Sequence, residues 1–148
     1  MSLPTFFGRA TAASAQHLHL GALLLELSAT CSNLVRQETP ESSELLHLLP
    51  ALEEEMRRHF RAEEADAYFG TLASELPALL PTIAELRADH TRMLEIVAEL
   101  RLLADDPTRA EDLARQCASL KETFEAHERV EAELVRSFLL RDRALTDD

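Results

Sequence analysis

Four histidines occupy positions where a helix would be expected to carry core leucines. His17, His59, His90 and His127 each continue a series of apolar residues spaced three or four positions apart. This spacing keeps side chains on one face of an α-helix, and the apolar face of a helix points into the core. A lone histidine on such a face is usually a hydrogen-bonded core residue. Four of them in one chain instead indicate imidazoles that converge on metal ions.

Two glutamates share these faces. Glu63 follows His59 by four residues, and Glu131 follows His127 by four, so each pair stacks one helical turn apart. A buried carboxylate without a partner costs on the order of several kcal/mol. Cations placed among the carboxylates and imidazoles would remove this cost. We therefore predict a layer of metal ligands made of His17, His59, Glu63, His90, His127 and Glu131.

The donor types limit the choice of metal. Imidazole and carboxylate donors suit iron, manganese or zinc, and the absence of thiolate ligands removes one reason to favour a closed structural zinc site. Two carboxylates that serve two ions fit a bridged dinuclear centre. Affinity alone does not select among these metals.

Other candidate ligands are given structural roles. His19 and His47 fall off the apolar faces and are expected to be non-ligands, with His19 as the alternative to His17. Cys31 and Cys117 lie several turns from the histidine layer and are expected to be small core residues. A solvated face is expected for the acidic residues Glu53, Glu54, Glu55, Glu64 and Asp66, and a core or rim position for Tyr68.

Four helices are needed to bring the predicted ligands together. Ser14 is expected to cap the first helix, and a cap followed by proline begins the second at Thr39-Pro40 and the fourth at Asp106-Pro107. Pro50 lies inside the second helix, where we expect a kink or a short helix joined to a longer one. The expected helices cover residues 14–36, 39–72, 81–104 and 107–141, with a break at 74–81 and a frayed acidic tail.

The composition predicts an all-α protein. Ala, Leu, Glu and Arg dominate the sequence, and glycine is rare, with 3 residues among 148. This length suits one domain over residues 1–148, with its core at about residues 14–141. Short connections imply antiparallel neighbours, so we predict an up-down-up-down four-helix bundle.

The net charge of −12 disfavours several classes of partner. Nucleic acids and anionic membrane surfaces require a basic face, so neither is expected as a partner. The longest apolar run, residues 18–27, is interrupted by His19 and Glu26 and is too short to span a bilayer. No export signal is apparent at the N-terminus, and a cytoplasmic location is expected.

The ordered set of motifs resembles the hemerythrin-like, or HHE cation-binding, family. A histidine and then His-x-x-x-Glu occur in the first two predicted helices, and the same pattern recurs in the last two. The segments that carry the resemblance are Gln16-His17, His59-Phe60-Arg61-Ala62-Glu63-Glu64, Asp89-His90 and His127-Glu128-Arg129-Val130-Glu131. Together they span roughly residues 15–135, which is nearly the whole chain.

This resemblance implies a non-haem diiron centre, with zinc or manganese as alternatives. It implies that His17 and His59 bind one iron and that His90 and His127 bind the other. Glu63 would bridge the two ions, as would Glu131 and an oxo or hydroxo group.

The chain departs from the oxygen-carrying members of the family. Leucines occupy the two candidate positions, Leu86 and Leu94, for the additional histidine of those carriers, and the last motif has Glu131 where the carriers have a later aspartate. The four-histidine, two-glutamate set is more similar to bacterial repair-of-iron-centres proteins and to the iron-sensing domain of a eukaryotic ubiquitin-ligase subunit.

Three classes of function are therefore considered. The expected function is binding of O2, NO or iron for sensing, buffering or stress response, rather than catalysis, with a protein partner or a homodimer as further options. The second is a diiron enzyme or iron donor that acts in nitric oxide or peroxide detoxification or in iron-centre repair. The third is a structural helical bundle that holds zinc or no metal.

Overall fold

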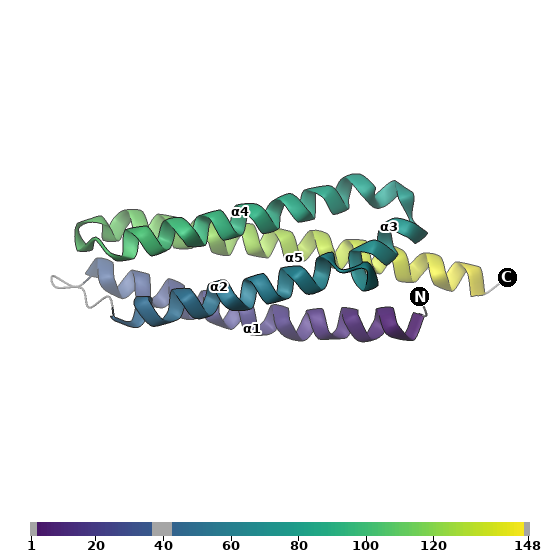
Figure 1. Cartoon of the computed structure of the whole chain (residues 1–148), viewed down its shortest axis with the longest axis horizontal. Helices are drawn as coiled ribbons and strands as arrows, with labels where there is room; N and C mark the ends of the chain where they lie inside the picture. Colours follow the sequence, from purple (N-terminus) through teal and green to yellow (C-terminus); the bar gives the residue numbers. More distant parts are fainter. Residues whose placement is uncertain (1–2, 37–42, 147–148) are drawn as a thin grey trace.

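Four long helices make up most of the molecule, as predicted. The computed structural model describes residues 3–36 and 43–146, and no strand occurs within these two segments. Figure 1 shows the long helices lying side by side. Their bounds are α1 (Leu3–Arg36), α2 (Ser43–Glu64), α4 (Leu80–Ala104) and α5 (Ala110–Thr146). Shorter helical segments join them, namely η1 (Asp66–Gly70), α3 (Thr71–Glu75), η2 (Pro77–Leu79) and η3 (Pro107–Arg109).

The long helices form a closed ring of neighbours. The helix α1 contacts α2 and α5, and α4 contacts the same two helices. Each helix thus has two neighbours, and successive long helices run in opposite directions along the bundle (Figure 1). This arrangement is the expected up-down-up-down bundle, in which the apolar face of every helix turns toward the common axis.

The core consists of two apolar clusters on either side of the histidine layer. One cluster contains the apolar core residues between Leu20 and Leu34 on α1 and between Leu45 and Met56 on α2, together with their counterparts on α4 and α5. The other lies near the opposite end of the bundle and includes Phe6, Tyr68, Phe69 and Leu134. Because apolar side chains pack above and below the layer, its polar groups are shielded from water along the bundle axis.

The first helix begins earlier than predicted. It starts at Leu3, so Ser14 lies well inside the helix and does not cap it. The alanine-rich stretch around Ser14 has high helix propensity, which favours continuation of the helix. Phe6 anchors the added turns, because its buried ring stacks on Tyr68 at 5.7 Å and lies 4.5 Å from Phe138.

The second helix ends earlier than predicted. It stops at Glu64, and Ala65 adopts an extended conformation with φ −65° and ψ 151°. The π-helical turn η1 and the short α3 follow, so residues 66–75 are helical but no longer continue α2. Pro50 lies inside α2, which is not divided into two helices there, and the predicted start at residues 39–40 lies outside the described residues.

The connections to α4 and α5 are more ordered than predicted. The expected proline-rich break contains the end of α3 and the 3-10 turn η2, and α4 begins at Leu80. Before α5, Asp106 accepts a hydrogen bond from the Thr108 backbone N–H at 3.0 Å, which confirms the predicted cap before Pro107. The helix itself starts at Ala110 and extends to Thr146, beyond the predicted end at residue 141. The last two residues of the expected tail lie outside the described segments.

Candidate metal centre

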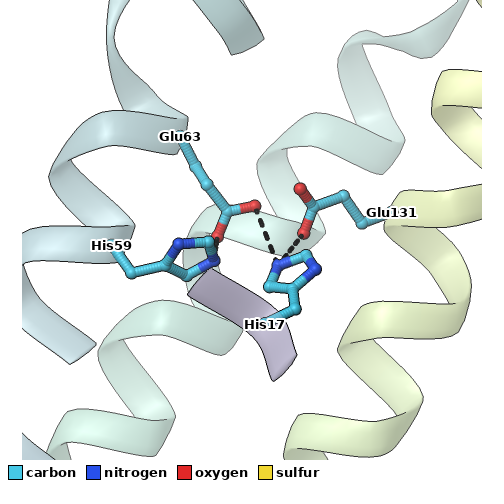
Figure 2. Close-up of side chains that lie close together, drawn as sticks. All are labelled: His17, His59, Glu63 and Glu131. Carbon is cyan, nitrogen blue, oxygen red and sulfur yellow. Dashed lines mark ion pairs between the residues drawn. The ribbon is translucent and has the colours of Figure 1, made fainter. Parts of the chain in front are cut away.

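The structure brings all six predicted ligands into one layer of the bundle. His17 comes from α1, His90 from α4, and the two His-x-x-x-Glu pairs from α2 and α5. Five of the six side chains are almost completely buried, and His17 retains 16% exposure. The layer forms because each residue occupies a core position of its helix at the same distance along the bundle. Figure 2 shows how His17, His59, Glu63 and Glu131 point toward one another.

Glu63 lies at the middle of the layer. Its Oε1 atom is 2.8 Å from His59 Nε2, 3.2 Å from His90 Nε2 and 3.7 Å from His127 Nε2. Its Oε2 atom is 3.9 Å from His17 Nε2 (Figure 2). One carboxylate therefore faces the imidazoles of all four helices.

Glu131 completes the layer from the opposite side. Its Oε2 atom lies 3.2 Å from His17 Nε2 and 3.5 Å from His127 Nε2. Its Oε1 atom accepts a hydrogen bond of 2.7 Å from the hydroxyl of Tyr68. The tyrosine thus fixes one carboxylate oxygen and leaves the other directed at the imidazoles.

The donor atoms fall into two groups, each compact enough to hold one ion. Within each group the atoms lie within 4.8 Å of one another. The first group contains His17, His59, Glu63 and Glu131, and the second contains Glu63, His90 and His127. The histidines thus divide between the groups as the family resemblance implies. Glu63 belongs to both groups and can serve both ions.

Each of the four histidines has an oxygen near its outward-facing Nδ1 atom. The pairs are His59 with Gln16 at 2.5 Å, His127 with Asp89 at 3.3 Å, His90 with Glu64 at 3.4 Å and His17 with Glu128 at 3.7 Å. A neutral imidazole that donates its Nδ1–H outward presents the lone pair of Nε2 inward. Carboxylates and amides in this position orient metal-binding histidines and increase their basicity.

The unpaired atoms of the layer fit bound cations. Buried polar atoms without a hydrogen-bond partner include Nε2 of His17 and His59, Oε2 of Glu131 and both carboxylate oxygens of Glu63. Such atoms are rarely left without a hydrogen bond inside a protein, because no new interaction then compensates for the hydrogen bonds to water that they lose on burial. Here they are lone-pair donors that face one another, and divalent cations among them would satisfy them. The residues present therefore suit a two-metal centre.

The two carboxylates differ in their protonation. Burial acts to raise the pKa of Glu63, but hydrogen bonds from His127, His59 and His90 outweigh it and hold that pKa below the usual range of a glutamate. Burial, together with the nearby Glu63, raises the pKa of Glu131 to about 7, although its hydrogen bond to His17 acts in the opposite direction. Glu63 is thus ready to bind a cation at neutral pH, whereas Glu131 must first release a proton in much of the metal-free protein.

We expect Asp89→Ala to weaken metal binding by about 10- to 100-fold. This is the typical effect of removing a residue that holds a metal-binding histidine from its outer side. Without the Asp89 carboxylate, the His127 ring loses the acceptor that fixes its orientation. Competitive titration with a metal-sensitive chelator would measure the change. The control is Asp105→Ala, at an exposed residue after α4 and away from the layer. Equal affinities for the two variants would contradict the orienting role.

The residues predicted not to bind metal lie away from the layer. His19 and His47 are exposed. Cys31 and Cys117 are buried in the core, where their thiols hydrogen-bond to each other. The expectation of a purely solvated acidic face was wrong for Glu64, because its carboxylate lies over the outer edge of His90.

Tyr68 and the four outer partners are functional candidates that the sequence reasoning did not identify. The outer partners carry a signal in the sequence, since Gln16, Glu64, Asp89 and Glu128 each adjoin a predicted ligand. Tyr68 has no such signal. It reaches Glu131 because the chain leaves α2 at Ala65 and turns back over the layer through η1.

A cavity leads from the surface to the layer. It has a volume of about 650 Å³ and lies between α1 and α5. His17, Tyr68 and Glu131 line it, together with small and apolar residues such as Ala13 and Val135. A molecule that enters this cavity would therefore meet the side of the layer formed by His17 and Glu131.

Comparison with known proteins gives one match. The sequence profile of the hemerythrin HHE cation binding domain matches residues 11–139, a segment that includes all six residues of the layer. No curated protein and no solved structure matches the chain.

Proposed function

Because this chain belongs to the hemerythrin HHE cation-binding family, we propose that its buried layer holds two non-haem iron ions that bind O2 or NO reversibly. The observation that carries this proposal is the convergence of four Nε2 atoms on two carboxylates, with an oxygen near every Nδ1 atom. The same site would bind and release iron, so iron is itself a candidate ligand. A role in sensing, buffering or stress response would follow.

The donor set supports iron over a structural zinc. Structural zinc sites are usually closed by four ligands, and cysteine is common among them. Here each group offers two imidazoles and the carboxylate of Glu63, with Glu131 added in one group, which leaves coordination positions free for a further ligand. The cavity beside His17 and Glu131 supports access of a small ligand to such a position. Ferrous ions would supply the electron density that O2 and NO need for binding.

The surroundings of the layer support binding more than turnover. His90 is held between aromatic rings, since Phe60 stacks on it at 4.0 Å and Phe69 at 5.8 Å. Leu86 and Met93 occupy the adjacent positions of α4 and are fully buried. An apolar shell of this kind limits the access of water and protons on the His90 side of the layer, and proton delivery is needed to reduce either gas to products.

Anaerobic metal analysis and gas titration would test the proposal. We expect two iron ions per chain, one molecule of NO or O2 bound per centre, and recovery of the starting absorption spectrum when the gas is removed. Zinc alone, or a folded protein without metal, would contradict the diiron assignment. If more than one equivalent of nitrous oxide per centre forms in the presence of a reductant, the result would instead support the alternative that the protein is a nitric oxide-reducing enzyme.

A further inference from the structure

The outer face of α1 carries almost no charge. Between Arg9 and Arg36 the only charged residue is Glu26, although 28% of the residues in the whole chain are charged. Two leucines on this face are strongly exposed, Leu18 at 79% and Leu25 at 59%. The part of α1 from Gly8 to Arg36 is long and apolar enough to cross a membrane, yet only 28% of its most apolar stretch is buried inside the bundle. Much of its apolar character therefore faces outward.

These exposed residues follow the spacing of a helix-pairing stripe. Ala15, Leu18, Ala22, Leu25 and Ala29 alternate steps of three and four residues, and all five are exposed. At 100° per residue the stripe lies about half a turn away from the buried stripe that packs into the bundle. Spacings that alternate between three and four residues are typical of side chains that pack against a second helix in a coiled coil. No described segment of the chain covers this stripe.

We propose that this face of α1 binds the same face of a second copy of the chain, in an antiparallel pair. The alternation of small and large residues is the basis for choosing a second copy. When the stripe is reversed and laid against itself, Leu25 of each copy faces Ala22 of the other, and Leu18 faces Ala29. Each of these layers combines one leucine with one alanine, so the volumes are complementary. Ala15 faces Ser32, which is also small and exposed.

The flanks of the stripe also permit close approach. On one side lie Ser14, Gly21 and Ser28, which are all small, and a Cβ atom added at Gly21 would meet nothing within 4 Å. On the other side lie His19 and Glu26, and the antiparallel register brings each His19 near the Glu26 of the other copy. Two chains of net charge −12 repel each other, so they would associate where the surface carries few carboxylates.

A membrane surface fits this face less well. Helices that lie on membranes combine large apolar side chains with lysine or arginine on the polar side. The α1 stripe is formed largely by alanine, and it lacks basic residues between Arg9 and Arg36. Small residues contribute little buried area against lipid, but they let two helix backbones approach closely.

Pairing would also affect access to the metal centre. A groove of about 390 Å³ between α1 and α5 reaches His17 and is lined by Leu18, Gly21, Ala22 and Leu25. These residues belong to the proposed interface or its flank. A second copy would cover this groove and close this approach to His17, which also lines the larger cavity beside Tyr68.

Sedimentation analysis of the full chain would test the pairing. We expect a mass twice the chain mass of 16.6 kDa for the wild type, and the chain mass for Leu18→Glu and for Ala22→Glu. Both residues are exposed, so helix content by circular dichroism should not change. The matched control is Leu102→Glu, because Leu102 on α4 has a similar exposure of 76% and lies outside the stripe. It should remain a dimer.

Spin labels on the flank would test the orientation. In the antiparallel register, labels at Glu26→Cys lie about 8 Å apart along the axis, and labels at Asn33→Cys lie about 28 Å apart. A parallel pair would give nearly equal distances for the two sites. Labelling of the wild type in the same way accounts for any reaction of buried Cys31 and Cys117.

Several results would overturn the proposal. These are a monomeric wild type at concentrations of about 100 µM, dimers that survive both substitutions in the stripe, or equal loss of dimer in the Leu102→Glu control. A monomer that sediments with phosphatidylcholine–phosphatidylglycerol vesicles would assign the face to a membrane instead. None of these measurements depends on iron or on gas binding, so the pairing and the proposed function fail independently.

Discussion

Glu63→Ala should remove both metal ions from the protein. Glu63 is the one residue that belongs to both groups of donor atoms, and its two oxygens face imidazoles from all four long helices. Its loss would take one donor from each group at once and would remove a negative charge that offsets the charge of bound cations. We expect metal affinity to fall by more than the ~100-fold that the loss of an outer partner costs. Inductively coupled plasma mass spectrometry would measure the metal content, from two ions per chain to fewer than one.

The control for this prediction is Glu54→Ala. Glu54 lies on the same helix, is exposed, and pairs only with Arg58 among the contacts described for it. This variant should keep both ions and an unchanged absorption spectrum. Glu63→Gln keeps the side-chain volume, so it separates the loss of the carboxylate from the loss of packing. Full metal content in Glu63→Gln and Glu63→Ala would show that the layer is not the metal site.

Glu131→Gln should stabilise the metal-free protein at pH 8. The folded protein raises the pKa of Glu131 to about 7 from the ordinary value of 4.5. Between these two values the unfolded chain has lost a proton that the folded protein still holds, so the contribution of Glu131 to stability falls as the pH rises. At pH 8 the buried carboxylate is ionised in both states, and the cost to the folded state reaches about 3 kcal/mol. Glutamine does not ionise, so it avoids this cost.

The pH dependence distinguishes this effect from a general gain in packing. We expect the free energy of unfolding of Glu131→Gln to exceed that of the wild type by up to about 3 kcal/mol at pH 8, and by less than about 1 kcal/mol at pH 5. Urea unfolding of both proteins in the presence of a chelator would measure it. Glu133→Gln, at an exposed residue of the same helix, should show no such difference. Equal stabilities at pH 8 would contradict the raised pKa of Glu131.

The same substitution should impair metal binding. Glu131 contributes Oε2 to the group around His17, and glutamine is a poorer ligand than a carboxylate. A variant that is more stable without metal yet binds less metal would show that the layer is arranged for cations, at a cost in the stability of the metal-free fold.

Helical periodicity was sufficient to predict the layer. The four histidines His17, His59, His90 and His127 share a face with neighbouring leucines because an α-helix has 3.6 residues per turn. This repeat is a local property of the backbone. The i,i+4 spacing placed Glu63 and Glu131 on the same faces for the same reason. The grouping of these residues in one layer was predicted, although the start of α1 and the end of α2 were not.

The ends of the helices were less predictable. Ser14 has the chemistry of a cap but lies inside α1, because Phe6 packs against Tyr68 and Phe138 and so keeps the preceding turns helical. Ala65 has high helix propensity, yet it is extended where α2 ends. The end of α2 at Ala65 thus departs from a local helix preference of about 1 kcal/mol or less.

The sequence by itself determined the helical class, the core face of each helix and the six donors, because all three depend on the short-range period of one secondary structure. Only the tertiary structure decided which oxygen lies behind each imidazole, how Tyr68 reaches Glu131, and that α1 exposes a second apolar stripe. These features arise where side chains of different helices pack against each other across the bundle. The spacing of residues along one helix carries no information about the distance between that helix and its neighbours.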